Sequence, residues 1–120
     1  MADAPEVDVT DVVDSTRYEA KVGGKLAGFV EYERREGRVI FPHTEVDDAF
    51  EGQGVGSTLA REVLHDARER GEKVVPLCPF IAGYIRRHDE YADLVDHEML
   101  ATYDQGEVDT DPATGTGGVD

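Results

Sequence analysis

The sequence predicts a mixed α/β fold in which antiparallel strands come first and a strand–helix–strand–helix run follows. Three patterns carry this prediction: a Gly-Gly hairpin signal at 23–24, a helical stripe of apolar residues from Val55 to Ala67, and a short apolar strand after Gly71. Crossovers between parallel strands of one sheet are almost always right-handed. We therefore expect the last strand to lie parallel to the strand that precedes the long helix.

The first half of the chain is typical of antiparallel strands separated by glycine turns. Apolar and polar residues alternate loosely over 15–22, and the Gly-Gly turn leads into a second strand over 25–33. A further glycine turn precedes a third strand over 38–46. Pro42 lies inside this third strand and cannot donate a ladder hydrogen bond, so we expect an edge, a bulge or an irregularity near it.

The second half predicts two helices around a buried strand. The apolar stripe from Val55 to Ala67 has charged residues on its opposite face, and Gly71 suits the C-cap of that helix. A short apolar strand is expected over 73–77. Pro79 then suits the first turn of a second helix, which completes the strand–helix–strand–helix run.

The chain is strongly acidic, and its two ends contain no basic residue. Of 120 residues, 27 are Asp or Glu and 12 are Lys or Arg, which gives a formal net charge of −15. Residues 1–16 hold five acids and residues 97–120 hold six. This balance argues against nucleic acid as a main partner, because phosphate binding needs clustered bases. The composition resembles that of halophilic proteins; an ordinary acidic protein with two solvated tails is the alternative.

One domain is expected, with an acidic tail on each side of it. The boundaries are a tail over 1–14, the domain over 15–100 and a C-terminal tail over 101–120, which we expect to be disordered because it has few large apolar residues. No apolar run approaches the roughly 18 residues of a membrane helix, and the first residues do not read as a secretory signal. The sequence therefore predicts a cytoplasmic protein without a membrane partner.

The segment 51–57, which reads Glu-Gly-Gln-Gly-Val-Gly-Ser, is the most informative for function. It lies between a predicted strand and the long amphipathic helix. Alternate glycines let the backbone approach a ligand, and unpaired N–H groups at a helix start suit a phosphate. A plain tight turn is the alternative. The segment has neither the Lys-Ser/Thr pair of a Walker loop nor a dinucleotide-binding βαβ unit upstream.

With the strand before it and the helix and strand after it, this segment resembles the acyl-coenzyme A pyrophosphate loop of the GNAT N-acetyltransferase superfamily. The resemblance is closest to small single-domain GNAT-like members, the YjdJ-type proteins, and covers about residues 18–95. The matching stretches are His43–Val46, Gly52–Gly56, Val75–Phe80 and Tyr84–His88. At Glu51 the superfamily usually has Gln or Arg, so the backbone would hold the pyrophosphate. The expected binding residues are Gln53, Gly54, Val55, Gly56 and Ser57.

The resemblance implies the GNAT-like acyl-CoA N-acyltransferase fold, a twisted, mainly antiparallel sheet flanked by helices and splayed at the cofactor strand. The pantetheine arm of acetyl-CoA or CoA would lie in the splay and bond to backbone groups near Val46, Asp47 and Asp48. A basic cluster at Arg86 and Arg87 would meet the adenosine 3′-phosphate or an acidic substrate. Pairing of these arginines with the acids that follow them is the alternative.

Acetyl transfer from a thioester to an amine needs a base, donors for the oxyanion and a proton for the departing thiolate. His43 and Glu45 are candidate bases, because strand alternation puts both on one face beside the presumed cofactor arm. A structural histidine and a surface acid are the alternatives. The resemblance places Tyr84 close to the tyrosine that protonates the thiolate; Tyr91 is a rival, and Tyr84 as a core aromatic is the alternative.

Cys78 offers a second chemical route. It is the single cysteine, it follows a buried strand, and it precedes a helix whose N-terminus favours the thiolate form. A thiolate could attack the thioester and form an acyl-enzyme. A small core residue with direct transfer, usual in the superfamily, is the alternative. No metal site is expected, because the histidines and acids lack a recognised ligand spacing.

These features leave three functions. The leading hypothesis is an N-acetyltransferase that moves acetyl from acetyl-CoA directly to an unidentified small-molecule or peptide amine. The second is a non-catalytic acyl-CoA-binding sensor or interaction module, because the chain lacks the extra N-terminal helices that build an acceptor pocket in larger members. The same gap leads us to expect a homodimer or a partner chain that completes the acceptor site. The third is a small acidic interaction domain whose glycine loop is only a turn.

Overall fold

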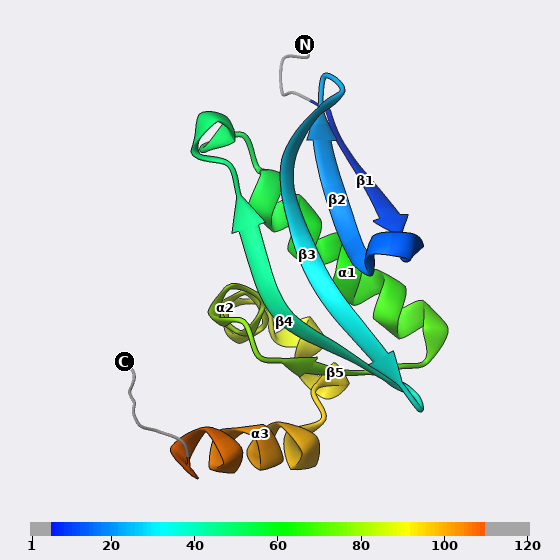
Figure 1. Cartoon of the computed structure of the whole chain (residues 1–120), viewed down its shortest axis with the longest axis vertical. Coiled ribbons are helices and arrows are strands. Elements are labelled where there is room, and N and C mark those ends of the chain that lie inside the picture. Colours follow the sequence, from blue (N-terminus) through cyan, green and yellow to red (C-terminus); the bar gives the residue numbers. More distant parts are fainter. Residues whose placement is uncertain (1–5, 110–120) are drawn as a thin grey trace.

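The computed structural model describes residues 6–109 and consists of one sheet with helices around it (Figure 1). Its strands and longer helices are β1 (Val7–Val12), β2 (Arg17–Val22), β3 (Lys25–Arg35), β4 (Arg38–Val46), α1 (Val55–Arg70), β5 (Lys73–Pro76), α2 (Pro79–Arg87) and α3 (His97–Asp109). Three short 3₁₀ turns complete it: η1 (Val13–Ser15), η2 (Asp48–Phe50) and η3 (Asp89–Leu94).

The five strands lie in the order β1-β2-β3-β4-β5. The first three pairings are antiparallel, and β5 pairs with β4 in parallel. The helix α1 makes the connection between those two parallel strands (Figure 1). The mixed α/β fold predicted from the sequence is therefore confirmed, including the parallel pairing of the last strand.

The irregularity expected near Pro42 is present. In the β3–β4 ladder Glu31 pairs with His43, whereas Glu33 pairs with Ile40. Two β4 residues, one of them Pro42, therefore lie opposite the single residue Tyr32. This is a β-bulge, and it removes the need for the backbone donor that proline lacks.

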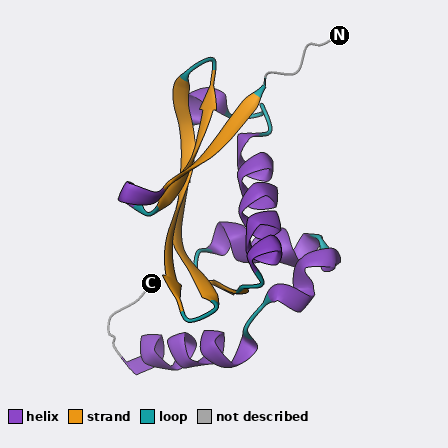
Figure 2. Ribbon diagram, turned by 90° about the vertical axis from the view of Figure 1, so that its right-hand side faces the viewer, coloured by secondary structure: helices purple, strands orange, loops and turns teal. Residues whose placement is uncertain are grey.

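The helix α1 covers one face of the sheet (Figure 2). Its apolar stripe, which includes Leu59 and Leu64, is fully buried. It packs in one hydrophobic cluster with alternate strand residues such as Val30 and Phe41. Burial of each such side chain contributes roughly 1.5–3 kcal/mol. Gly71 ends the helix in the left-handed conformation at φ 72°, as predicted.

The residues that alternate with this cluster project from the other face of β3 and β4. We call the part of the sheet that carries Phe29, Glu31, His43 and Glu45 the open face. Within residues 6–109 no long helix runs along it, and Figure 2 shows α1 only on the opposite side. The sheet therefore presents half-buried and exposed side chains here rather than a covered core.

The N-terminal boundary differs from the expected tail over 1–14, because β1 lies inside that segment. Val7 pairs with Val22 and Val12 pairs with Arg17 along the edge of the sheet. Val7 and Val9 alternate with Asp8 and Thr10 in this strand, a short period-two pattern that the count of acids obscured. The chain then makes η1 before β2, where the sequence predicted a strand from residue 15.

The C-terminal boundary also differs from the expected one. The helix α3 begins inside the predicted domain and continues to Asp109, beyond the predicted boundary at residue 100. The remainder of the expected C-terminal tail, 110–120, lies outside the described residues.

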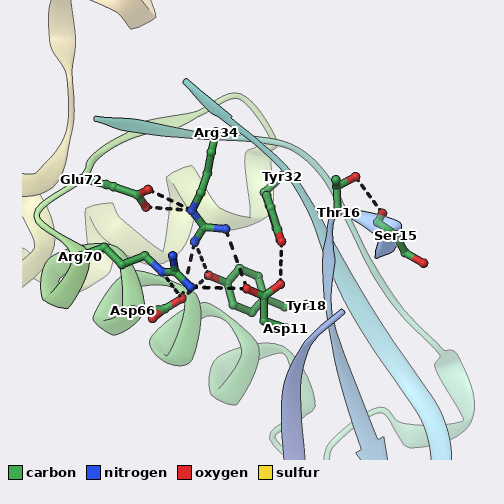
Figure 3. Close-up of polar contacts among 9 residues, drawn as sticks. All are labelled: Asp11, Ser15, Thr16, Tyr18, Tyr32, Arg34, Asp66, Arg70 and Glu72. Carbon is green, nitrogen blue, oxygen red and sulfur yellow. Dashed lines mark hydrogen bonds and ion pairs between the residues drawn. The ribbon is translucent and has the colours of Figure 1, made fainter. Parts of the chain in front are cut away.

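A polar network fastens the C-terminal half of α1 to the sheet (Figure 3). The Tyr18 hydroxyl donates to the Asp66 carboxylate at 2.5 Å, and Arg34 donates to the Tyr18 oxygen at 2.7 Å. Arg34 also holds Glu72 at 3.0 Å, and Arg70 holds Asp66 at 3.0 Å. Burial alone would raise the pKa of Asp66, but the bonds from Tyr18 and Arg70 outweigh it and hold that pKa below its ordinary value.

Candidate active site

The N-terminus of α1 presents free backbone donors. Gly54 is its N-cap in the left-handed conformation at φ 80°, and the first bond of the helix runs from Thr58 N–H to the Gly54 carbonyl at 3.0 Å. The N–H groups of Val55, Gly56 and Ser57 meet no acceptor in the described part of the chain. These donors and the positive end of the helix dipole can hold a phosphate group.

Gln53 departs from the set expected to bind the pyrophosphate. Its backbone N–H donates to the Phe50 carbonyl at 3.2 Å, within the turn that follows η2. The donors that remain available therefore begin after Gln53, in the first turn of α1 itself. Glu51 is exposed beside them, so its side chain brings a negative charge near the mouth of this anion site.

A gap opens between β4 and β5 next to these donors. Their parallel pairing ends where Phe41 meets Pro76, but β4 continues to Val46. The Phe41 carbonyl accepts from both Leu77 N–H at 3.1 Å and Cys78 N–H at 2.9 Å, which turns the chain into α2. The second half of β4 therefore has an edge that β5 does not pair with.

The ladder between β3 and β4 decides which backbone groups face this gap. Asp47 N–H donates to the Ala27 carbonyl at 2.8 Å. In an antiparallel pair every second residue turns its N–H and C=O groups toward the partner strand, and the residues between turn theirs away from it. The N–H and C=O groups of Thr44 and Val46 therefore point into the gap. Of the residues expected to bind the pantetheine arm, Val46 has its backbone groups free, Asp47 N–H is occupied, and Asp48 begins η2.

His43 and Glu45 lie together on the open face, as strand alternation predicts. His43 Nε2 and Glu45 Oε2 are 2.8 Å apart, and their side chains are 49% and 61% exposed. The ring of Phe29 on the neighbouring strand lies 6.1 Å from the imidazole. A carboxylate that orients an exposed imidazole is an arrangement able to accept a proton from a bound amine.

Cys78 lies on the other side of β4. It is the N-cap residue of α2 and is 3% exposed. Its Sγ is 3.2 Å from Thr44 Oγ1, and Thr44 comes from the strand position between the two candidate bases. Because successive strand side chains point to opposite faces, β4 separates the thiol from His43 and Glu45. The structure therefore does not bring all the candidate catalytic residues into one cluster.

Thr44 is a site residue that the sequence analysis did not single out. Its signal was present: it lies between His43 and Glu45 in a strand, so it must face the opposite way, toward the end of β5. What the period-two pattern could not supply is the position of Cys78, which depends on how the chain turns from β5 into α2.

Tyr84 is buried in α2, with 5% of its surface exposed. Its ring stacks on His88 at 4.1 Å between centroids. No side chain within residues 6–103 bonds its hydroxyl, whereas the hydroxyl of Tyr91 lies 2.9 Å from His65 Nε2. Burial raises the pKa of Tyr91, and that residue is already engaged in its own bond. Tyr84 is therefore the freer of the two rival tyrosines.

Arg86 and Arg87 extend from the last turn of α2. Both are exposed, and both guanidinium groups fold back toward Gly83, where an added Cβ would lie 3.4 Å from Arg87 and 3.6 Å from Arg86. Among the residues that the structure describes, no carboxylate is within 4 Å of either. The alternative in which they only pair with the following acids is therefore not seen.

A cavity away from all of these candidates lies against α1. It has a volume of about 440 Å³, lies between the β1–β2 hairpin and the outer side of α1, and includes Asp11, Asp66 and Arg70 in its lining. Arg70 pairs with both acids there, at 3.6 and 3.0 Å. These charges belong to the polar network of Figure 3, so their geometry accounts for a structural role.

Comparison with known proteins agrees with this geometry. A family model described as GCN5-related N-acetyl-transferase matches residues 17–94. A GCN5-like protein from Staphylococcus aureus, solved by NMR, is 23% identical with a TM-score of 0.57, over 78% of this chain and 90% of that one. This second match shows a shared fold. No curated protein sequence matches the chain.

Two longer enzymes match over a smaller part. A GNAT family acetyltransferase from Brucella melitensis, solved with acetyl-CoA, is 27% identical with a TM-score of 0.49, over 59% of this chain and 49% of that one. The ribosomal-protein-S18-alanine N-acetyltransferase from Escherichia coli is 20% identical with a TM-score of 0.48, over 50% and 39%. The chain thus covers less than half the length of each of these two enzymes.

Proposed function

Because the chain belongs to the GCN5-related N-acetyl-transferase family, we propose that it transfers an acetyl group from acetyl-CoA directly to an amine. Acetyl-CoA is the acyl donor that this family uses. One observation carries the proposal: the free N–H groups at the start of α1 lie at the end of the β4 segment whose edge is unpaired. A phosphate-binding helix end and a free strand edge in succession suit a ligand with a diphosphate and an amide-containing arm.

The residues present fit such a ligand. Val55, Gly56 and Ser57 would donate to the pyrophosphate, and the backbone of Thr44 and Val46 would bond the amides of the arm. Arg86 and Arg87 would meet the 3′-phosphate, because arginine forks match phosphate oxygens and no carboxylate in the described part of the chain pairs with these two. When bound, acetyl-CoA supplies an activated thioester.

Side chains of this protein account for the proton transfers. A C–N bond forms to the amine as the C–S bond breaks, so one proton must leave the nitrogen and one must reach the sulfur. The His43–Glu45 pair accepts the first, since it is exposed on the open face where an amine can approach. The Tyr84 hydroxyl, which no described residue holds, supplies the second. Of the gap-facing groups of β4, the Thr44 N–H would stabilise the developing oxyanion, while its carbonyl and the backbone of Val46 bond the arm.

An acyl-enzyme on Cys78 is the second route to the same reaction. The position of the thiol at the N-cap of α2 and its contact with Thr44 favour it. The burial of Cys78 and the location of the candidate bases on the opposite face of β4 favour direct transfer. Direct transfer is therefore the route that the proposal adopts.

Binding of the coenzyme is the primary test. Isothermal titration with CoA and acetyl-CoA, at several salt concentrations so that an acidic fold stays intact, should give saturable binding to one site. Release of free thiol from acetyl-CoA in the presence of an amine panel should then follow. Absence of binding at millimolar ligand would overturn the proposal. Binding without thiol release to any amine would instead support the acyl-CoA-binding sensor.

Several sequence-based expectations remain part of this proposal. We expect the reaction to take place in the cytoplasm. We also expect a halophilic protein, which stays folded at high salt. The expected acceptor is a small-molecule or peptide amine. A homodimer or partner chain would complete the acceptor site. In the described chain, no helix is both long enough and apolar enough to span a membrane. Membership in the YjdJ-type subgroup also stays a prediction.

A further inference from the structure

A hollow of about 200 Å³ lies at the end of the β3–β4 ribbon, next to the candidate bases. Its lining includes Leu26 and Phe29 from β3, and Glu45 and Asp47 at the end of β4. Leu26 is 41% exposed, one of two large hydrophobic side chains so exposed in the described part of the protein. The hollow thus combines apolar surface, an aromatic ring and two carboxylates, a mixture typical of small-molecule sites.

The two carboxylates of this hollow have no ion-pair partner among the described Lys and Arg residues, although Lys21 lies across the β2–β3 ladder from Leu26. No Lys or Arg among residues 6–109 lies within 4 Å of Glu45 or Asp47. Arg17 lies 4.3 Å above the ring of Phe29, but it is paired with Glu19 at 2.8 Å. The hollow therefore complements a cation.

Each of the two carboxylates keeps one oxygen free. Glu45 Oε2 is engaged by His43, and Asp47 Oδ1 accepts from Ala49 N–H at 2.9 Å. The other oxygen of each has no hydrogen-bond partner within the described chain. Two residues apart on an extended chain, the two acids are separated by about 7 Å along the backbone. That spacing is comparable to the distance between two nitrogen atoms joined by four methylenes.

We propose that this hollow is the acceptor subsite and that it selects linear diamines. This inference rests on the proposed acetyltransferase function. One nitrogen binds at Glu45 as an ammonium ion and releases one proton to solvent before the attack, and the His43–Glu45 pair accepts the next proton as the C–N bond forms. The second stays an ammonium ion and binds Asp47, while the methylene chain covers Leu26 and Phe29. Acetylation makes the first nitrogen a neutral amide, which removes its attraction to Glu45 and favours release.

A matched pair of amines tests this proposal. Acetyl transfer to 1,4-diaminobutane and to n-butylamine is measured at constant ionic strength in the native protein, Asp47→Asn and Glu69→Gln. Asp47→Asn keeps the oxygen that caps η2 and removes only the charge. Glu69 is an exposed acid on α1 and serves as the control. We expect a KM about tenfold lower for the diamine, a preference lost in Asp47→Asn and kept in Glu69→Gln.

A binding measurement without coenzyme separates this inference from the proposed function. In ¹⁵N–¹H NMR titrations, 1,4-diaminobutane should shift the amides of residues 26–29 and 45–47, and n-butylamine should not. Such shifts support the subsite even if no amine is acetylated. A lack of acetylation would contradict only the proposed enzymatic function. Three results would overturn the proposed diamine subsite: equal KM values for the two amines, equal effects of the two substitutions, or the absence of diamine-induced shifts at these amides.

Discussion

The ring of Phe80 lies directly against Gly56, so closely that a Cβ on the glycine would come within 2.7 Å of the ring atom Cζ. Gly56 is in the first turn of α1, and Phe80 is in the first turn of α2. The contact therefore joins the starts of two helices at the proposed anion site. The glycine is needed for this packing, in addition to any close approach of the backbone to a ligand.

Gly56→Ala is expected to destabilise the protein by about 1–3 kcal/mol and to weaken CoA binding, because Phe80 must move or the helix start must shift. Urea denaturation and titration calorimetry measure the two effects. The double variant with Phe80→Leu relieves the overlap and should recover part of both losses. If Gly56→Ala alone binds CoA as tightly as the native protein, the contact does not shape the site.

Cys78→Ala should retain near-native turnover, because direct transfer does not use the thiol. Turnover is followed by thiol release, and intact-protein mass spectrometry after mixing with acetyl-CoA looks for a covalent acetyl adduct. Thr44→Val, which removes the neighbouring hydroxyl, is the companion variant. Loss of turnover in Cys78→Ala together with an adduct in the native protein would establish the acyl-enzyme route instead.

His43→Gln should lower kcat by about 10²–10⁴-fold while changing the affinity for CoA little, since the imidazole is proposed to accept the proton of the amine. Its exposed position argues against a folding defect as the source of such a loss, and thermal unfolding checks this. Steady-state kinetics across pH provide the measurement. An unchanged kcat would remove His43 from the mechanism and leave Glu45 as the candidate base.

Arg86→Gln with Arg87→Gln should raise the dissociation constant for CoA about tenfold. The same double variant should bind dephospho-CoA, which lacks the 3′-phosphate, as well as the native protein does. Comparison of the two ligands by calorimetry therefore isolates the phosphate contact from general charge effects. Equal losses for CoA and dephospho-CoA would show that these arginines act through the overall field of the acidic protein.

The stability of the protein should depend on Asp66 at low pH. Its pKa in the folded state is below its ordinary value, so its contribution is complete above the unfolded pKa of about 4 and is lost as pH falls through the folded pKa. Asp66→Asn should cost about 1–2 kcal/mol at neutral pH and flatten the dependence below pH 4. Urea midpoints between pH 2 and 7 test this, and parallel curves for the two proteins would contradict it.

The elements that the sequence predicts well are those with a strong periodic pattern and a matching end signal. The stripe from Val55 to Ala67 and the cap at Gly71 define α1, and the helix begins and ends where predicted. In contrast, β1 was hidden because six residues with two acids carry little apolar signal, and its pairing with β2 supplies the rest of the stabilisation.

The candidate site was predictable only in its local parts. Alternation along β4 is enough to put His43 and Glu45 together, and the glycine-rich segment is enough to place donors at the start of α1. The contact of Cys78 with Thr44 and the bond of Tyr18 to Asp66 join residues 34 and 48 positions apart. Such pairs depend on tertiary packing, and no local spacing in the sequence encodes them.

The position of β4 between the thiol side and the open face has a kinetic consequence. The coenzyme would enter from the helix side of that strand and the amine from the uncovered side, so neither blocks the path of the other. Initial rates should then fit a random-order sequential scheme, with either reactant able to load first. Spent CoA could also leave before or after the acetylated product departs.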